Sequence, residues 1–134
     1  MADRTADLLE AIYDVLAGDA ALTAIIGADK VWDHVRAGAA EPYVVIGETT
    51  AVDAGAVGID AQEHTVTIHA WSITPSSLQV RTIVAAVRAA LHDADLTLAA
   101  GQCRNLRCEI TETMRDPDGV THHGVLRFRA VTQD

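Results

Sequence analysis

Leucine and isoleucine recur at helical spacing near the start of the chain, with acidic residues between them. This pattern predicts an amphipathic helix over residues 5–17, with Thr5 as its N-cap and Gly18 at its end. Asp19 is a second candidate cap, and it is expected to begin a short helix that ends at Gly27.

A longer helix is predicted over residues 74–92. Thr74 can cap its first turn, and Pro75 suits the first helical position, where the missing N–H costs nothing. The apolar residues of this stretch fall on one stripe, which is expected to face the core; they are Val80, Ile83, Val84, Val87 and Leu91.

The other apolar stretches favour β-strands, because they are rich in β-branched residues or alternate with polar ones. They are residues 30–35, 43–52, 62–73, 96–98, 103–115 and 120–131. Two pairs of these strands follow each other directly and predict hairpins. The first has a glycine-containing connection at 53–61, and the second has the turn Asp116-Pro117-Asp118-Gly119.

Alternation within the second hairpin assigns its side chains to two faces. The dry face is expected to hold Leu106, Cys108 and Ile110 from one strand and Leu126, Phe128 and Ala130 from the other. The wet face is expected to gather Arg107, Glu109, Arg127 and Arg129. These charges predict either cross-strand ion pairs on a solvated face or a surface that faces a subunit or DNA.

Together these elements predict a single α+β domain over residues 1–134. An antiparallel sheet built from two hairpins plus a short strand is expected to carry the helices on one face, with the core between them. A chain of 134 residues that is 49% hydrophobic can bury such a core without a disulfide or a metal. No apolar run approaches the roughly 20 residues that span a bilayer, so no membrane partner is expected. The first residues also lack the apolar core of a signal peptide.

The chain carries a net charge of −9, and all of it falls in residues 1–67. The second half balances seven acidic residues with seven basic ones. An acidic protein does not wrap nucleic acid by neutralising its phosphates, although it can offer DNA a surface that does not hold it.

No group of residues indicates catalysis or a bound cofactor. Adjacent His122 and His123 are expected on opposite faces of a strand, and so are His64 and His69, so neither pair is suited to chelate a metal. The two cysteines are expected to be free thiols. The serines and glycines form no nucleophile motif or phosphate-binding loop. We therefore expect no catalytic, cofactor-binding or metal-binding residues.

The connection at 53–61 is the most unusual segment of the chain. Its aliphatic side chains have no evident place to be buried in a monomer. It is either a disordered hairpin loop or an arm that docks on a neighbouring subunit or a tube. The second hypothesis assigns the contact to Asp53, Ala54, Gly55, Val57, Gly58 and Ile59.

Three motifs stand in a fixed order along the chain: EPYVVIGE at 41–48, EHTVTIHAWS at 63–72 and DPDGVTHHGVLRFR at 116–129. Together they closely resemble a family of small tail-completion proteins, the tail terminators of long-tailed phages, prophages and gene transfer agents. The opening helix and residues 91–96 fit the same family, so the resemblance covers nearly the whole chain.

The resemblance implies a structural virion protein. Members of such families form a homo-oligomeric ring, usually a hexamer, that caps the tail tube and ends its polymerisation. The implied partners are the tail tube protein and a head-side connector or stopper, and double-stranded DNA passes through the ring. The implied location is the bacterial cytoplasm during assembly and then the head-proximal end of the tail.

Two other functions stay open. A stopper, a connector or a tube subunit has a similar size and charge. A small enzyme or ligand-binding domain would instead place a pocket between the sheet and the helices. Its candidate polar groups are His69, Trp71 and Arg127.

Overall fold

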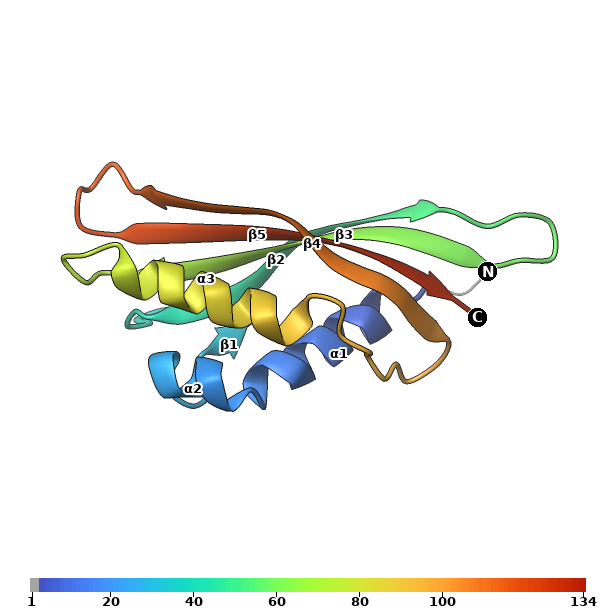
Figure 1. Cartoon of the computed structure of the whole chain (residues 1–134), viewed down its shortest axis with the longest axis horizontal. Coiled ribbons are helices and arrows are strands. Elements are labelled where there is room, and N and C mark those ends of the chain that lie inside the picture. The colour runs from blue at the N-terminus through green and yellow to red at the C-terminus, as the bar shows by residue number, and fades with distance from the viewer. Residues whose placement is uncertain (1–2) are drawn as a thin grey trace.

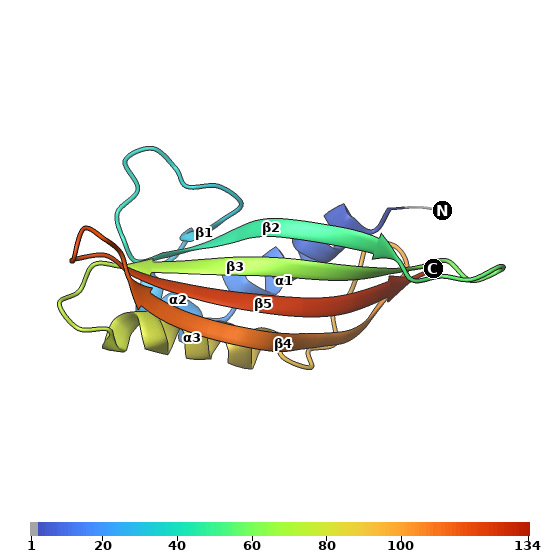
Figure 2. The ribbon, with the colours of Figure 1, turned by 90° about the horizontal axis from the view of Figure 1, so that it is seen from above.

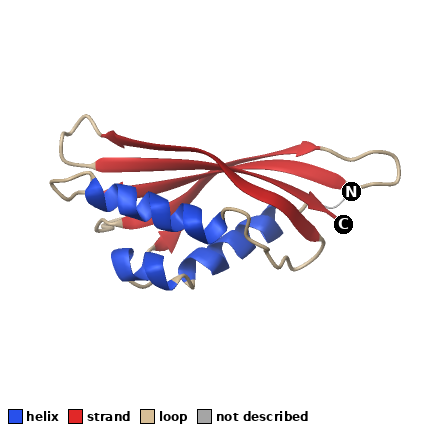
Figure 3. Ribbon diagram, viewed as in Figure 1, coloured by secondary structure: helices blue, strands red, loops and turns tan. Residues whose placement is uncertain are grey.

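The computed structural model describes residues 3–134. Its strands form one sheet with the order β1-β2-β3-β5-β4, and its helices all lie against the same face of that sheet (Figures 1 and 3). The strands are β1 (Val31–Trp32), β2 (Tyr43–Asp53), β3 (Ala61–Ser72), β4 (Gln102–Arg115) and β5 (His122–Gln133). The helices are α1 (Thr5–Ala17), α2 (Ala20–Ile26) and α3 (Leu78–Leu91). The predicted α+β class is confirmed.

The sheet joins two hairpins, β2–β3 and β4–β5, through an antiparallel pairing of β3 with β5. This central pairing runs in unbroken register from Ala61 opposite Gln133 to Ser72 opposite His122. The short β1 lies parallel to β2 at the sheet's edge. We call the face without helices the outer face.

The core lies between the helices and the inner face of the sheet. Each fully buried aliphatic or aromatic side chain contributes about 1.5–3 kcal/mol, and the predicted stripe of α3 is buried in full. Gly124 of β5 lets the helix come close, because a Cβ at this position would lie 2.5 Å from Cγ2 of Val84. The other fully buried residues of this core include Leu8, Ile12 and Leu16 of α1, Val66 and Ile68 of β3, and Phe128 of β5.

Two predicted helix starts are wrong. α3 begins at Leu78, because the Thr74 hydroxyl donates to the Ser76 carbonyl (2.9 Å) instead of capping a helix. The Ser76 hydroxyl accepts from the Leu78 N–H (3.0 Å), so the chain turns once more after Pro75 before the helix forms. In α1, Thr5 is the first helical residue rather than the cap.

The Asp19 cap is confirmed, since its carboxylate accepts from the Leu22 N–H at 2.9 Å. Gly27 then ends α2 with φ of +90°. That backbone conformation favours glycine.

The predicted faces of β4 are only partly right. Its register with β5 shifts between Arg104 and Arg107 and again between Cys108 and Ile110. Because a bulge adds a residue to one strand, it moves the following side chains to the other face. Ile110 consequently lies beside Arg127 on the outer face and is 44% exposed, whereas Leu106 is buried as expected.

Two predicted strands are shorter than expected or absent. Residues 96–98 form no strand; Leu96 instead anchors a loop to the core. Residues 30–35 reduce to β1, and a loop at 33–42 follows it (Figure 2). The ammonium of Lys30 donates to the carbonyls of Ala40 (2.8 Å) and Pro42 (3.0 Å), which holds the end of this loop against β1.

Candidate functional site

The arm, residues 53–61, continues the β2–β3 hairpin beyond the end of the sheet (Figures 1 and 2). Asp53 and Ala61 still belong to the strands. At the tip, Ala56 and Ile59 exchange two backbone hydrogen bonds of 2.9 Å around a two-residue turn. Gly58, the second residue of that turn, has φ of +81°, a conformation that a type II turn requires at this position and that favours glycine. The arm is therefore a narrow hydrogen-bonded hairpin.

The arm presents aliphatic side chains to solvent. Val57 at the tip is fully exposed, Ile59 is 59% exposed and Val52 at the base is 61% exposed. Gly55 lets the two sides of the arm approach, because a Cβ there would lie 2.3 Å from the Ile59 carbonyl oxygen. Asp53 accepts a hydrogen bond from the Gly55 N–H at 3.0 Å. A hydrogen-bonded backbone thus holds an apolar tip away from the core.

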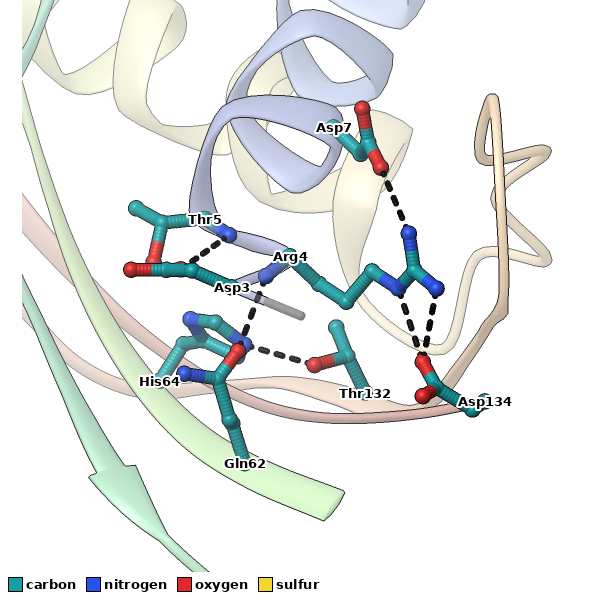
Figure 4. Close-up of polar contacts among 8 residues, drawn as sticks. All are labelled: Asp3, Arg4, Thr5, Asp7, Gln62, His64, Thr132 and Asp134. Atoms are coloured by element: carbon teal, nitrogen blue, oxygen red, sulfur yellow. Dashed lines mark hydrogen bonds and ion pairs between the residues drawn. The ribbon is translucent and has the colours of Figure 1, made fainter. Parts of the chain in front are cut away.

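Arg4 ties the start of α1 to the strand ends at the base of the arm (Figure 4). Its guanidinium donates to one carboxylate oxygen of Asp134 at 2.7 and 2.9 Å and reaches Asp7 at 3.5 Å. Its backbone N–H donates to the side-chain carbonyl of Gln62 at 2.9 Å. These contacts fix the platform from which the arm extends.

His64 lies fully buried beside this platform (Figure 4). Its Nε2 forms a 2.7 Å hydrogen bond with the Thr132 hydroxyl, while its Nδ1 has no partner among residues 3–134. Burial lowers the pKa of His64, and the charge of Asp3 only partly opposes this effect. The ring is therefore neutral at pH 7.

Within the described residues, the predicted charged group on the outer face forms three ion pairs and leaves one arginine without a pair. Arg129 lies between Glu109 (3.3 Å) and Glu63 (3.8 Å). Arg107 turns away to Asp93, 2.7 Å from its carboxylate, and Arg127 is exposed with no ion pair among the described residues. Pairs as exposed as these contribute at most about 1 kcal/mol each.

A polar cluster that we did not predict lies on the outer face at the end opposite the arm. His69 Nε2 is 3.0 Å from a Glu48 carboxylate oxygen, and His69 Nδ1 is 2.7 Å from His123 Nε2. The His123 ring stacks on Trp71, with 3.8 Å between ring centroids. A hollow of about 400 Å³ opens beside these residues and is also lined by Asp33 and Val35 from the loop after β1.

The cluster is a chain of hydrogen bonds rather than a chelating site. Both ring nitrogens of His69 take part in this chain of hydrogen bonds. Residues 3–134 hold no group of three side chains arranged for a metal. Burial and the charge of His69 lower the pKa of His123. Burial opposes the shift at Glu48, but the hydrogen bond and charge of His69 still hold its pKa below the ordinary value. The described residues lining the hollow include no hydroxyl or thiol that the imidazoles could activate.

The hypothesis of a small enzyme placed its polar groups between the sheet and the helices. His69, Trp71 and Arg127 instead occupy outward positions on β3 and β5, on the face away from the helices. The pairing of His69 with His123 joins strands 54 residues apart in sequence. This contact between His69 and His123 could be predicted only by knowing that β3 lies beside β5.

Within the described residues, neither the two cysteine thiols nor the helices indicate a further functional site. Burial raises the pKa of Cys103 and of Cys108, which disfavours the reactive thiolate. Within residues 3–134, no helix is long and apolar enough to cross a bilayer.

Comparison with known families identifies the kind of protein to which this chain belongs. Residues 10–133 match the model of the family described as tail completion protein gp17. The chain belongs to this family. The tail completion family is structural, so the resemblance found in the motifs is confirmed and a structural role in the tail follows.

A solved structure extends the comparison to the whole chain. A chain of the structure described as "Virion of native gene transfer agent (GTA) particle" is 27% identical to this one. The match covers 100% of both chains with a TM-score of 0.92. No curated protein sequence matches significantly. Every element described above therefore lies within the part of the chain that aligns with this particle component.

Proposed function

We propose that this protein forms a ring of six subunits that caps the tail tube, ends tube polymerisation and joins the tail to a head-side connector. Double-stranded DNA passes through the ring without being held. The ring assembles in the bacterial cytoplasm and takes its place at the head-proximal end of the tail of a phage, prophage or gene transfer agent.

The observation that carries this proposal is the match over the full length of both chains to a component of a gene transfer agent particle. A chain that shares the whole fold of a particle component can present corresponding surfaces for assembly. The match to the tail completion family supports a structural role in the tail.

The arm supports an assembly role for this chain. Burying one exposed aliphatic side chain such as Val57 contributes about 1.5–3 kcal/mol. Because the backbone of the arm is already hydrogen-bonded, docking it costs little ordering entropy. A head-to-tail ring needs different patches that meet on neighbouring copies, and an apolar arm supplies one such patch or a contact with the tube.

The overall charge and the pairing of Arg129 support passage of DNA without capture, while Arg127 on the same face has no ion pair among the described residues. The net charge of −9 repels phosphates, and Arg129 on the outer face forms ion pairs with Glu109 and Glu63. Arginines that are already paired are poorly placed to replace the counterions of DNA.

Co-assembly with the tail tube protein tests the proposal. Purified tube subunits should polymerise to variable lengths alone, and addition of this protein should give tubes with a ring at one end and a bounded length in negative-stain images. The protein alone should form rings at high concentration.

The same experiment separates the other candidates. Incorporation along the tube wall would identify a tube subunit, and binding only to the head-side connector would identify a stopper or connector. Tubes that grow equally with and without the protein, and that carry no ring, would refute the proposal.

A further inference from the structure

The sheet has two long edges, one formed by β4 and the other by β2 with the short β1. In Figure 2, α3 follows the β4 edge, while β1 and part of α1 lie along the β2 edge. The two edges differ in the side chains they expose, and this difference bears on how copies of the chain meet.

The β4 edge is basic. A groove of about 430 Å³ runs between α3 and β4 and is lined by Arg81, Arg88 and one acidic residue, Glu112. A neighbouring hollow adds Arg115 at the end of β4. All three arginines are exposed, and none forms an ion pair within residues 3–134. Their charges are therefore free for a partner.

The β2 edge is acidic. A hollow of about 340 Å³ between α1 and β1 is lined by Glu10, Asp33 and the exposed Tyr13, with Arg36 as its basic residue. The guanidinium of Arg36 lies over the Trp32 ring, 4.9 Å from its centroid. Asp33, which pairs with the exposed His34, also lines the outer-face hollow. Glu48 lines the same hollow. Three exposed carboxylates thus outnumber the single arginine.

Both edges also carry strand backbone that no other strand covers. β1 pairs with β2 only at Val44 and Val45. On β4, the backbone groups of Leu106 and Cys108 bond to Asp93 and His92. The stretch 109–115 lies beyond those contacts, next to the basic groove. Open strand edges are surfaces that pair with another chain unless charge or a bulge prevents it.

We infer that the acidic α1–β1–β2 edge of one copy binds the basic α3–β4 edge of the next copy. The occupant of each edge is a second copy of this chain, because the charges on the two edges are complementary and each edge combines charge with a hollow. Such a contact joins two different patches, so it repeats around a closed ring. The inference rests on the proposed ring and specifies its subunit interface.

Charge reversal tests this assignment. One variant reverses the basic edge (Arg81→Glu with Arg88→Glu), and the other reverses the acidic edge (Glu10→Lys with Asp33→Lys). Each variant alone then presents like charges on both edges. Each should need at least a tenfold higher concentration than wild type to form rings, measured by sedimentation velocity and negative-stain imaging.

An equimolar mixture of the two variants is the decisive sample. The unchanged acidic edge of the first variant fits the unchanged basic edge of the second, and the two reversed edges fit each other. Alternating mixed rings should therefore form where neither variant assembles alone. Raising the salt concentration should weaken wild-type and mixed rings alike.

A control reverses one exposed arginine on β5, which is an interior strand of the sheet, and this variant (Arg127→Glu) should assemble as wild type does. Thermal unfolding of each variant tests whether the exposed substitutions leave the fold intact. Folded reversal variants that form rings alone, or a folded mixture that stays unassembled, would overturn the edge assignment. A wild-type protein that forms no ring at all would instead refute the proposed function, and this interface with it.

Discussion

His64 shows how one buried residue couples stability to pH. Its ring is fully buried, one nitrogen bonds to Thr132, and the other has no partner among the described residues. Burial lowers its pKa in the folded state, while the unfolded chain titrates near the ordinary value of about 6.5. The unfolded state therefore takes up the proton first as the pH falls.

Acidification from pH 7.5 to 5 is expected to lower the unfolding temperature. The stability that neutral His64 provides is complete above about pH 6.5 and is lost as the pH falls below that value. His123 acts in the same direction, since burial and His69 lower its pKa. Thermal unfolding between pH 5 and 8 should show a shallower pH dependence for His64→Gln than for wild type. The exposed His34→Gln serves as the control, and equal slopes for wild type and His64→Gln would exclude His64 as the responsible group.

At the scale of elements, local pattern predicted most helices and strands but not their exact ends. The apolar stripe of α3 and the alternation of β5 are set by burial against one core, so periodicity found them. Thr74 failed as a helix cap because its hydroxyl found a nearer partner in Ser76. Ile110 changed face because a bulge shifts register, and no single-strand pattern reports a bulge.

The candidate sites were predictable to different degrees. The arm was found because small and aliphatic residues interrupt two strands. The ion pair of Glu109 with Arg129 follows from hairpin pairing, but the contact of Arg107 with Asp93 depends on the path of the loop after α3. The cluster of His69 and His123 requires the β3–β5 pairing, which joins the two hairpins and leaves no local signal.

Shortening the arm tests its role as an element. Replacement of residues 55–60 by Asn-Gly joins Ala54 and Ala61, which lie opposite each other, by a two-residue hairpin turn. The unfolding temperature should change by only a few degrees, because Val57 and Ile59 make little contact with the core. Capping of tubes should be lost or strongly reduced in the co-assembly experiment.

Val57→Asp should weaken capping in the same direction without shortening the arm. Thr97→Asp, in an exposed loop, is the matched control and should leave capping unchanged. Normal rings and normal tube lengths with the shortened arm would remove the arm from the interface.

At the scale of the whole molecule, charge is divided in a way that no single site reveals. The first half of the sequence holds the whole net charge of −9, and the fold brings β1, β2 and α1 from that half together along one edge. The balanced second half supplies α3 and β4 along the other edge. A chain can thus repel DNA overall and still attract a copy of itself.

The net charge leads to a prediction for DNA. The purified protein should not retard double-stranded DNA in a mobility-shift experiment at about 150 mM salt, because binding through phosphates needs a surplus of basic residues. Retardation of the DNA at micromolar protein concentration would contradict the proposal that DNA passes through the ring without being held. Repeating the measurement at about 20 mM salt exposes any weak electrostatic attraction.

Lys30 has a practical consequence for work on this protein. It is the single lysine of the sequence, and its ammonium holds two carbonyls at the end of the 33–42 loop. Reagents that acylate lysine side chains therefore modify one defined point, and neutralising that amine frees the loop end from β1. Crosslinkers that join two lysines will miss most contacts between subunits, so chemical mapping of an assembly should rely on carboxylate-directed reagents, for which the acidic edge provides abundant targets.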